Sequence, residues 1–597
     1  MTATGTRLEG HVGPITAVDV DPLGRAVTGG YDGRLVGWER DGRKPRWVAE
    51  RPALINSVRI AGDRVYVVGA DRVLAVHDLG CGTQLRTTSA ELPDDLNVVD
   101  IAPCGTTVAV GGETGGPYFY RLPDLAPVLF RTSIARCVNG LSFLTWNGRS
   151  AICLGDDDGW LTIIDVPNQE IIAEFDLGAT VETVRPTADR NGILVGLEDG
   201  RVMQLSTRDD GAVVRNIVTE HLGAVKSIAV SIDGDIASSA YDGLIKCVLK
   251  GGRRRTLELA GEAWQGWSRG LSFDPSDSGQ LVASSLGTVP QIWDVKTGAL
   301  RLPDAKSTLG LNAIDATHDG KIFAGGDYGV LFQVVGKDVT STDVSSMLTA
   351  VSVNAAGSVA WTGAFDGQVR RHDPASGRTT TNRLLDTTPV NCLAIDSAAR
   401  SLAAGTYSGL IELMDPDTLV GRKAFRTKAA IKALTFVDDF NRLVAGLADG
   451  RLVAWDLATE RIVFVIDGLT LVNAVAWSKS RGLLAATGRD LALRLISPDG
   501  DVVAECHEVH ERSVKTLAWS PSGKFLATGS YDATVAVWRV EEKPILVGRF
   551  TGHDRPGVAA VRWISDEALA SAGWDGAIRI WCPMKGLTST YTPGLHA

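Results

Sequence analysis

Two short segments near opposite ends of the chain decide the fold: GGYDGRLVGW, residues 29–38, and AGWDGAIRIW, residues 572–581. Each has an aromatic residue before Asp-Gly, an alternating apolar run after it and a closing Trp. Alternating apolar residues are typical of a half-buried β-strand, and Asp-Gly is typical of a tight hairpin turn. The two segments are therefore interpreted as copies of a structural hairpin rather than as one active site used twice.

The hairpin recurs along the whole chain about every 42 residues, a spacing typical of four-stranded propeller blades. Each repeat has a short apolar strand, a turn, a second strand, the Asp-Gly turn, a third strand and a variable fourth strand. A two-residue turn of this composition predicts type I′ geometry, with positive φ at both central residues. The turn Asp or its equivalent is found at Asp32, Asp71, Glu113, Asp158, Asp199, Asp242, Gly287, Tyr328, Asp366, Ser408, Asp449, Asp490, Asp532 and Asp575.

Length and composition restrict the class of protein. A chain of 597 residues is too long for one hydrophobic core, and its 44% hydrophobic and 22% charged residues are ordinary for a globular protein. The net charge of −10 argues against a general nucleic-acid or anionic-membrane surface. The sequence has no apolar run long enough for a membrane helix and no signal-peptide pattern at its start. Eight cysteines without a CxxC pair indicate a reducing compartment, so we expect a cytoplasmic location, and the Arg-rich composition suggests a bacterial source.

The best-preserved repeats resemble the WD40 family. In that family a His before the first strand, Ser or Thr on the second, Asp in the turn and Trp on the third form a hydrogen-bonded set within a blade. A partial set is His221, Ser238 and Asp242, with Val248 where Trp is expected. The complete sets are His11, Thr28, Asp32 and Trp38; His510, Thr528, Asp532 and Trp538; and His553, Ser571, Asp575 and Trp581.

The resemblance covers essentially the whole chain and implies an all-β architecture. Fourteen blades are too many for a usual single ring, so we predict two tandem seven-bladed β-propellers with four antiparallel strands per blade. The predicted propellers are residues 1–305 and 306–597. An N-terminal strand at residues 5–10 is expected to complete a blade made by distant sequence, either the seventh or the fourteenth.

Four motifs could carry other chemistry, and each has a structural interpretation. ECHEVHE (505–511) has the wrong spacing for the HExxH zinc motif, and its last His already belongs to a WD40-like set. GGETGG (111–116) has no following helix to bind phosphate, GDDDGW (155–160) lacks EF-hand spacing, and KGGRRR (250–255) is a single basic run. We therefore predict no catalytic residues, no metal site and no cofactor.

In the WD40 family the residue before the turn Asp often contacts partners. The sequence therefore predicts a non-catalytic scaffold that binds one or more proteins or peptides, in a complex of signalling or defence type. The alternatives are a propeller enzyme or small-molecule or metal binder that uses a central channel, and a nucleic-acid-binding propeller. The predicted partner-binding residues are Asp327, Phe365, Tyr407, Arg489, Tyr531 and Trp574 in the second propeller, and Tyr31 and Tyr241 in the first.

Overall fold

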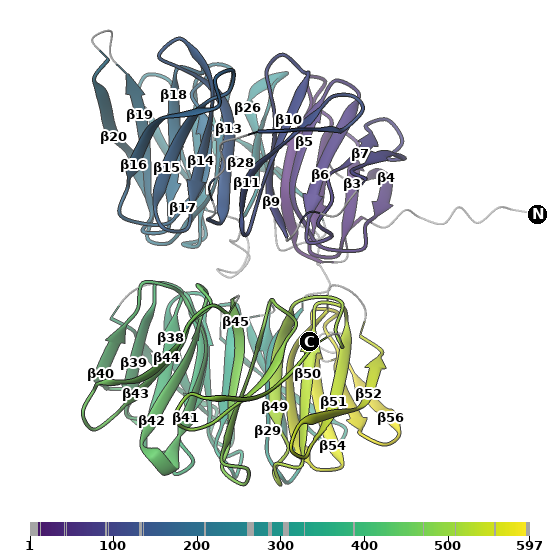
Figure 1. The fold of residues 1–597 in the computed structure, drawn as a ribbon, viewed down its shortest axis with the longest axis vertical. Helices are drawn as coiled ribbons and strands as arrows, with labels where there is room; N and C mark the ends of the chain where they lie inside the picture. The colour runs from purple at the N-terminus through teal and green to yellow at the C-terminus, as the bar shows by residue number, and fades with distance from the viewer. Residues whose placement is uncertain are drawn as a thin grey trace, which may run out of the picture. The chain divides into compact units, whose positions relative to one another are not determined.

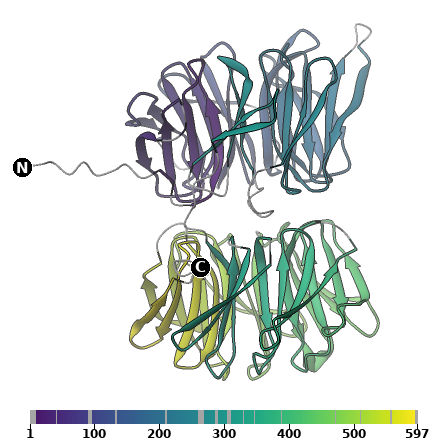
Figure 2. The ribbon, with the colours of Figure 1, turned by 180° about the vertical axis from the view of Figure 1, so that it is seen from behind.

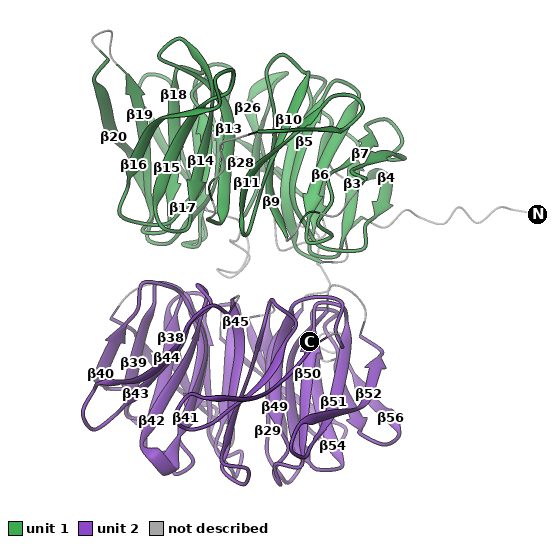
Figure 3. Ribbon diagram, in the orientation of Figure 1, with its two compact units in different colours: residues 1–307 green, residues 308–597 purple. Residues whose placement is uncertain are grey.

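The computed structural model describes most of residues 10–592, and its strands form fourteen four-stranded antiparallel sheets. The chain divides into two compact units, residues 1–307 (unit 1) and residues 308–597 (unit 2) (Figure 3). The predicted boundary between residues 305 and 306 lies outside the described residues. Among the described residues there is no helix long and apolar enough to cross a membrane. Within 10–592, the residues not described are 12, 41, 43, 90–91, 93–94, 131–133, 135, 208–210, 259–267, 285–288, 303–309, 328, 345, 386–387, 470, 508 and 554–556.

Unit 1 contains blades 1 to 7, each made of four strands that follow one another in the chain. The strands are, in blade 1, β1 (Ile15–Val20), β2 (Ala26–Gly30), β3 (Arg34–Trp38) and β4 (Pro45–Glu50); in blade 2, β5 (Ile55–Ala61), β6 (Arg64–Gly69), β7 (Ala75–Asp78) and β8 (Gln84–Thr87); in blade 3, β9 (Leu96–Ile101), β10 (Thr107–Gly112), β11 (Gly115–Arg121) and β12 (Ala126–Val128); in blade 4, β13 (Val138–Trp146), β14 (Arg149–Asp156), β15 (Trp160–Asp165) and β16 (Glu170–Asp176); in blade 5, β17 (Val181–Pro186), β18 (Gly192–Leu197), β19 (Arg201–Thr207) and β20 (Val213–Glu220); in blade 6, β21 (Val225–Val230), β22 (Ile236–Ala240), β23 (Leu244–Val248) and β24 (Arg254–Glu258); and in blade 7, β25 (Leu271–Asp274), β26 (Asp277–Ala283), β27 (Gln291–Asp294) and β28 (Ala299–Leu302).

Unit 2 contains blades 8 to 14, built in the same way. The strands are, in blade 8, β29 (Leu311–Ala316), β30 (Ile322–Gly326), β31 (Val330–Val335) and β32 (Asp338–Asp343); in blade 9, β33 (Leu348–Val353), β34 (Ala360–Ala364), β35 (Gln368–Asp373) and β36 (Arg378–Arg383); in blade 10, β37 (Val390–Ile395), β38 (Leu402–Thr406), β39 (Leu410–Met414) and β40 (Gly421–Arg426); in blade 11, β41 (Ile431–Val437), β42 (Arg442–Leu447), β43 (Leu452–Asp456) and β44 (Ile462–Ile466); in blade 12, β45 (Val472–Ser478), β46 (Leu483–Gly488), β47 (Leu493–Ile496) and β48 (Val502–Cys506); in blade 13, β49 (Val514–Trp519), β50 (Phe525–Ser530), β51 (Thr534–Val540) and β52 (Pro544–Thr551); and in blade 14, β53 (Val558–Ser565), β54 (Ala568–Gly573), β55 (Ile578–Cys582) and β56 (Gly586–Tyr591). A short 3-10 helix, η1 (Asp438–Phe440), connects β41 to β42.

The first strands of neighbouring blades contact one another, so they are the innermost strands of each unit. In unit 1, β1 contacts both β5 and β25, and in unit 2, β29 contacts both β33 and β53. Each series of blades therefore returns to its start and forms a closed ring of sheets (Figure 1, Figure 2). This architecture confirms the prediction of two tandem seven-bladed β-propellers with four antiparallel strands per blade.

The rings close differently from the expectation based on sequence. Blades 7 and 14 have outer strands of their own, β28 and β56, so neither needs residues 5–10 as its fourth strand. Residues 5–9 themselves lie outside the described residues. Side chains join the ends of the ring instead: Ser272 of blade 7 donates to Asp19 of blade 1, and Arg562 of blade 14 pairs with Asp315 of blade 8 at 2.7 Å.

The hydrophobic core lies between neighbouring blades. One buried cluster combines Trp146 and Ile163 of blade 4 with Val181 and Val195 of blade 5. Close packing explains a Gly that recurs on the second strand. A Cβ on Gly29 would lie 2.3 Å from the side chain of Ile55 in the next blade, so the β-branched residue of one first strand packs directly on the bare backbone of its neighbour.

The Asp-Gly turns differ from the predicted type I′ geometry. In blade 1 the loop has three residues, Tyr31, Asp32 and Gly33, and the Gly33 N–H donates to Gly30 O at 3.2 Å. Only Gly33 of the three has positive φ, at 72°. This is a type I turn followed by a left-handed glycine, the usual three-residue hairpin. The Asp32 side chain accepts a hydrogen bond from the Arg34 N–H at 3.0 Å.

Candidate functional site

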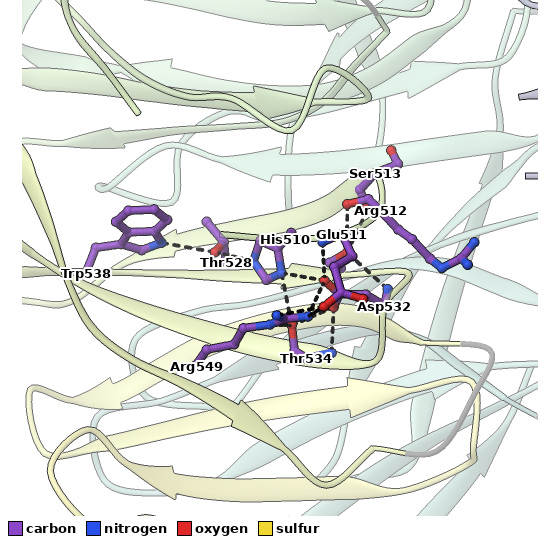
Figure 4. A network of polar contacts seen from close by, with 10 residues as sticks. His510, Glu511, Arg512, Ser513, Thr528, Asp532, Thr534, Trp538 and Arg549 are labelled. Carbon is purple, nitrogen blue, oxygen red and sulfur yellow. Dashed lines mark hydrogen bonds and ion pairs between the residues drawn. The ribbon is translucent and has the colours of Figure 1, made fainter. Parts of the chain in front are cut away.

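The predicted WD40-like set of blade 13 forms a continuous hydrogen-bonded chain (Figure 4). Trp538 Nε1 donates to Thr528 Oγ1 at 3.1 Å, Thr528 Oγ1 lies 2.8 Å from His510 Nε2, and His510 Nδ1 lies 3.2 Å from Asp532 Oδ2. An indole N–H only donates and a carboxylate only accepts, so the donors must point from Trp538 towards Asp532. This order fits a neutral His510 with its proton on Nδ1.

The other two complete sets repeat this geometry, and the partial set keeps its His, Ser and Asp. In blade 6, His221 lies 2.9 Å from Ser238 Oγ and 3.0 Å from Asp242 Oδ2. The Trp-to-hydroxyl, His-to-hydroxyl and His-to-Asp distances are 2.7, 2.7 and 3.1 Å for Trp38, Thr28, His11 and Asp32, and 2.7, 2.6 and 3.0 Å for Trp581, Ser571, His553 and Asp575.

The environment of Asp532 shows that the set is a structural element. Burial raises the pKa of Asp532, but hydrogen bonds from His510, Thr534 and the Glu511 N–H lower it to about 2. Arg549 also lies 3.3 Å from the carboxylate. His510, Thr528 and Trp538 are buried, so the polar groups of the set are used within the blade and stabilise its loop.

The residue before the turn Asp occupies the first position of the three-residue loop, and we call these residues the loop residues. In unit 2 they include a stacked pair: the rings of Tyr531 and Trp574 have centroids 4.9 Å apart and planes 26° apart. Trp574 Nε1 also donates to Asn312 Oδ1 of blade 8 at 2.8 Å. These two loop residues of neighbouring blades therefore contact one another, and both remain partly exposed.

Three further predicted loop residues of unit 2 are also partly exposed. Lys432 of blade 11 places Nζ 5.6 Å from the ring centroid of Tyr407 of blade 10, a cation–π distance. Phe365 and Arg489 hold the same loop position in blades 9 and 12. Since strands alternate in direction, all of these loops lie at the end of the propeller where the first strands begin.

Asp327 differs from the other predicted partner-binding residues. Its side chain is buried, with 3% of the residue exposed, and accepts hydrogen bonds from the Gly310 N–H at 3.0 Å and Asn312 Nδ2 at 2.9 Å. Burial raises its pKa to about 6, against the lowering effect of those two hydrogen bonds. Asp327 supports the start of β29 and does not present its carboxylate at the surface.

The two predicted residues of unit 1 contact cations. Arg269 of blade 7 donates to the Tyr31 hydroxyl at 2.8 Å, across the junction between the last and the first blade. Lys226 places Nζ 4.9 Å from the ring centroid of Tyr241 and forms an ion pair with Glu182 of blade 5. Both tyrosines are partly exposed and are already engaged by charged side chains.

A second set of residues at the same end was missed by sequence reasoning. In every blade except blade 7, whose described pairing begins at Leu271, the register of the first strand shifts around its second residue, which marks a β-bulge. Asparagines at this position reach the next blade: Asn391 Nδ2 donates to Ile431 O at 2.9 Å, and Asn473 Nδ2 donates to Val514 O at 3.0 Å. The signal in the sequence is a polar residue directly after the first apolar residue of a strand.

We call these second residues the bulge residues, and their charge differs between the units. Those of unit 1 are Thr16, Asn56, Asn97, Asn139, Glu182 and Lys226. Those of unit 2 are Asn312, Thr349, Asn391, Lys432, Asn473, Lys515 and Ala559. We define the unit 2 rim as the loop residues Phe365, Tyr407, Arg489, Tyr531 and Trp574 with the bulge lysines Lys432 and Lys515.

The corresponding end of unit 1 has acidic loop residues. Its loop residues include Asp157 and Glu198, in blades 4 and 5. Burial and the Glu182 carboxylate raise the pKa of Glu198 to about 7. Lys226 acts in the opposite direction on Glu198, but burial is the larger effect.

Charged residues on the innermost strands of unit 1 pair between blades. Arg59 of blade 2 lies 3.4 Å from Asp100 of blade 3, and Ser142 of blade 4 donates to the same carboxylate at 2.9 Å. The Ile60 N–H donates to Asp19 of blade 1 at 2.8 Å. These contacts join neighbouring blades, so the charged residues on the innermost strands of unit 1 have a structural role.

The two histidines of the zinc-like motif contact different partners. His507 Nε2 pairs with Glu505 at 2.7 Å, while His510 is held in its hydrogen-bonded set. Residue 508 lies outside the described residues. Over the part of the chain that the structure describes, no group of three or more His, Cys, Asp or Glu side chains could hold a metal ion.

The remaining motifs have roles within the blades. Residues 111–116 form the hairpin between β10 and β11. In residues 155–160, Asp156 accepts a hydrogen bond from the Trp160 N–H at 2.8 Å. In the basic run, Arg255 donates to Thr297 O at 2.9 Å and to Lys296 O at 2.8 Å. Arg255 thus joins blade 6 to blade 7.

Comparison with known proteins matches three of the repeats. The family model described as "WD domain, G-beta repeat" matches residues 3–39, 500–539 and 544–582. A ribosome biogenesis protein WDR12 homolog from Culex quinquefasciatus is 25% identical over 219 residues, which is 32% of this chain and 51% of that protein. The chain thus spans about half the length of this curated relative.

Two further relatives and one solved structure show weaker or shorter matches. The WDR12 homolog of Nematostella vectensis is 30% identical over 26% of this chain and 37% of its own length, and telomerase protein component 1 of Rattus norvegicus is 26% identical over 28% and 7%. A chain of the crystal structure of the mitotic checkpoint complex is 21% identical, with a TM-score of 0.42, over 46% of this chain and 86% of its own. These curated relatives come from animals, and the bacterial source suggested by composition stays a prediction.

Proposed function

Because this chain carries WD40 repeats within two seven-bladed propellers, we propose that it is a non-catalytic scaffold that binds protein partners at the unit 2 rim. The observation that carries the proposal is the gathering of partly exposed aromatic side chains at one end of unit 2. Tyr531 stacks on Trp574 there, and Tyr407 lies beside Lys432. Tyr, Trp and Arg are the residues most enriched at the energetic centres of protein interfaces.

Two propellers on one chain would allow the protein to hold two partners together, within a complex of signalling or defence type. One relative is named as a component of telomerase and others are named for ribosome biogenesis, and membership of an assembly fits a scaffold. All eight cysteines are free thiols. Free thiols support a reducing compartment, and we propose that this is the cytoplasm.

A protein partner is better supported than a nucleic acid. The chain has a net charge of −10. Proteins that bind nucleic acids normally contact the phosphate backbone through a continuous stripe of Lys and Arg side chains. The basic run at residues 250–255 does not provide one, because Arg255 is engaged by backbone carbonyls of the next blade.

Affinity purification of the tagged full chain, followed by mass spectrometry, tests the proposal. A rim variant carrying Phe365→Ala, Tyr407→Ala and Tyr531→Ala is compared with the wild type. Trp574 is left in place because its hydrogen bond to Asn312 joins blade 14 to blade 8. The control is Phe440→Ala, since Phe440 is an exposed aromatic residue in η1, between the first and second strands at the opposite end of unit 2.

We expect co-purifying proteins to be lost from the rim variant and retained by the control. Circular dichroism and the melting temperature establish that the rim variant is folded. Retention of the same proteins by a folded rim variant would exclude this surface as the binding site.

A further inference from the structure

The outer strand of blade 11, β44, has an unusual composition for an edge strand (Figure 1). Its sequence is IVFVI, five apolar residues in succession. Among the described outer strands of five or more residues, every other strand contains at least one polar or charged residue. Natural proteins usually protect an edge strand from unwanted pairing by placing charged residues or Pro within it. The sequence of β44 does not contain this protection.

The apolar side chains of β44 are also exposed. The exposed fraction is 58% for Ile462, 38% for Val463 and 41% for Val465. In the described sheets β44 pairs with β43 alone, so the other backbone edge of β44 has no strand beside it there. An edge strand presents a row of backbone N–H and C=O groups that can pair with a further strand. β44 thus offers both apolar side chains and backbone hydrogen-bonding groups at the surface of unit 2.

The neighbouring blades carry a charge where β44 carries a valine. Val465 lies opposite Val453 of β43, and Glu505 and Arg549 occupy the same register position in β48 and β52. In all three strands a β-bulge occurs two residues earlier, so the bulge does not distinguish β44 from its neighbours. A charged residue at this position disfavours a further strand, because pairing would remove water from the charge. Blades 12 and 13 have this obstacle and blade 11 does not.

One face of β44 is fixed by packing on the next blade. Phe464 and Ile466 contact a buried cluster that includes Val472 and Leu484 of blade 12. A Cβ on Gly500, in the turn that precedes β48, would lie 2.7 Å from the Phe464 ring. These contacts hold the strand in place, so little conformational entropy is lost when a further strand pairs with it.

The sequence of β44 is the same in both directions. If two copies of the strand pair antiparallel with Phe464 at the centre, Phe464 lies opposite Phe464 of the second copy. In that register Ile462 lies opposite Ile466, and Val463 lies opposite Val465. Cross-strand pairs of β-branched and aromatic side chains stabilise an antiparallel sheet. A second copy of β44 therefore provides a matching apolar residue at every position.

The residues that flank β44 extend this match to charge. Arg461 precedes the strand and Asp467 follows it, and both are exposed. In the register centred on Phe464, Arg461 of each copy lies opposite Asp467 of the other, which gives two pairs of opposite charge. The adjacent charges are Glu460, which pairs with Lys423 of blade 10 at 2.9 Å, and Arg451, which lies within electrostatic range of Asp467.

We propose that β44 joins two copies of this chain by antiparallel edge-to-edge pairing, so that the two blade 11 sheets form one continuous sheet. A second copy fits better than a strand of another protein, because the segment at residues 461–467 is complementary to itself in both apolar residues and charge. The same patch serves both copies, so the interface closes after two chains. The pairing surface is separate from the unit 2 rim, and the inference does not depend on the proposed scaffold function.

Sedimentation velocity of the full chain tests the proposal. An interface of one short strand per copy is small, so we expect a weak association that appears between roughly 1 and 100 µM protein. The mass should rise reversibly from 63.3 kDa towards twice that value. Val465→Glu gives blade 11 the residue type of Glu505 and should weaken the association by about tenfold or more. The matched control is Val503→Glu, at an exposed valine of β48, which should leave the association unchanged.

Charge reversal tests the register of the two strands. Arg461→Asp alone would place two carboxylates opposite each other at both ends of the interface, and should weaken the association by about threefold or more. The double variant Arg461→Asp, Asp467→Arg exchanges the two charges and should restore the association to the wild-type level. Circular dichroism and the melting temperature establish that each variant is folded.

Three results would overturn the proposal. The first is a chain that stays monomeric throughout this concentration range, and the second is an association that Val465→Glu affects no more than Val503→Glu does. The third is a double charge reversal that fails to restore what Arg461→Asp removes. Since the substitutions at the unit 2 rim leave β44 unchanged, loss of partners at the rim and loss of self-association can be observed separately.

Discussion

The indole N–H of Trp574 donates a 2.8 Å hydrogen bond to the side-chain oxygen of Asn312, which lies 262 residues earlier in the chain. The bond joins the last blade of unit 2 to its first. Asn312 also donates to Leu348 O of blade 9 at 3.1 Å. One asparagine therefore contributes to two neighbouring junctions of the ring.

This contact predicts energetic coupling between the two residues. Trp574→Phe keeps an aromatic ring beside Tyr531 but removes the N–H donor, and Asn312→Ala removes the acceptor. In a double-mutant cycle measured by chemical denaturation of the full chain, we expect a coupling of about 0.5–1.5 kcal/mol. Strictly additive effects of the two substitutions would show that the contact does not stabilise the ring.

The hydrogen-bonded set of blade 13 predicts a large effect from a small substitution. Thr528→Val preserves the shape of the side chain but leaves His510 Nε2 and Trp538 Nε1 without their buried partner. We expect a loss of about 1–3 kcal/mol in the free energy of unfolding. Thr590→Val, at an exposed position of β56, is the matched control and should change stability little. Equal effects of the two substitutions would contradict the structural role of the set.

The low pKa of Asp532 predicts loss of stability in acid. Its pKa is lowered from 3.8 to about 2 in the folded protein, so the unfolded chain binds the proton more readily. The stabilisation is therefore complete above about pH 4 and is lost as the pH falls towards 2. Denaturation curves between pH 5 and 2 should be flatter for Asp532→Asn than for the wild type. Asp338→Asn, at an exposed strand position, should leave the slope unchanged.

Glu198 predicts the opposite dependence in unit 1. Its pKa is raised from 4.5 to about 7, so the folded protein holds the proton more tightly than the unfolded chain. Ionisation therefore reduces stability as the pH rises from about 4.5 to 7. Glu198→Gln should be more stable than the wild type at pH 8 and equal to it at pH 4, by thermal denaturation. Glu170→Gln, at the exposed start of β16, should show no such difference, and a uniform effect of Glu198→Gln at both pH values would contradict the assignment.

The repeat could be predicted because its signals are local. Strand alternation, the loop Asp and the closing Trp each depend on a few consecutive residues, so Trp38 and Trp581 indicate equivalent positions although the chain between them is long. The hydrogen bonds within the WD40-like sets could also be predicted, because the resemblance to the family gives the order of the His, hydroxyl, Asp and Trp residues along each repeat.

Features that depend on the neighbouring blade were not predictable in the same way. A β-bulge inserts one residue into a strand without altering the composition of the strand. In the sequence, Lys515 therefore has the pattern of any polar residue in an alternating strand. Asp327 shares the loop position of Tyr531, yet Gly310 and Asn312 bury it with their hydrogen bonds. The predicted type I′ turn was wrong because an Asp-Gly pair occurs in both two-residue and three-residue hairpin loops.

The closure of unit 2 by side chains has a consequence for its connectivity. No strand of blade 14 belongs to the sheet of blade 8, so the junction between them is of the same kind as every other junction in the ring. A circularly permuted chain that starts at blade 9 and ends with blade 8 would cut no described sheet. Nascent blades of unit 2 would likewise complete their own hydrogen-bonded ladders in order of synthesis, without waiting for a distant strand to arrive.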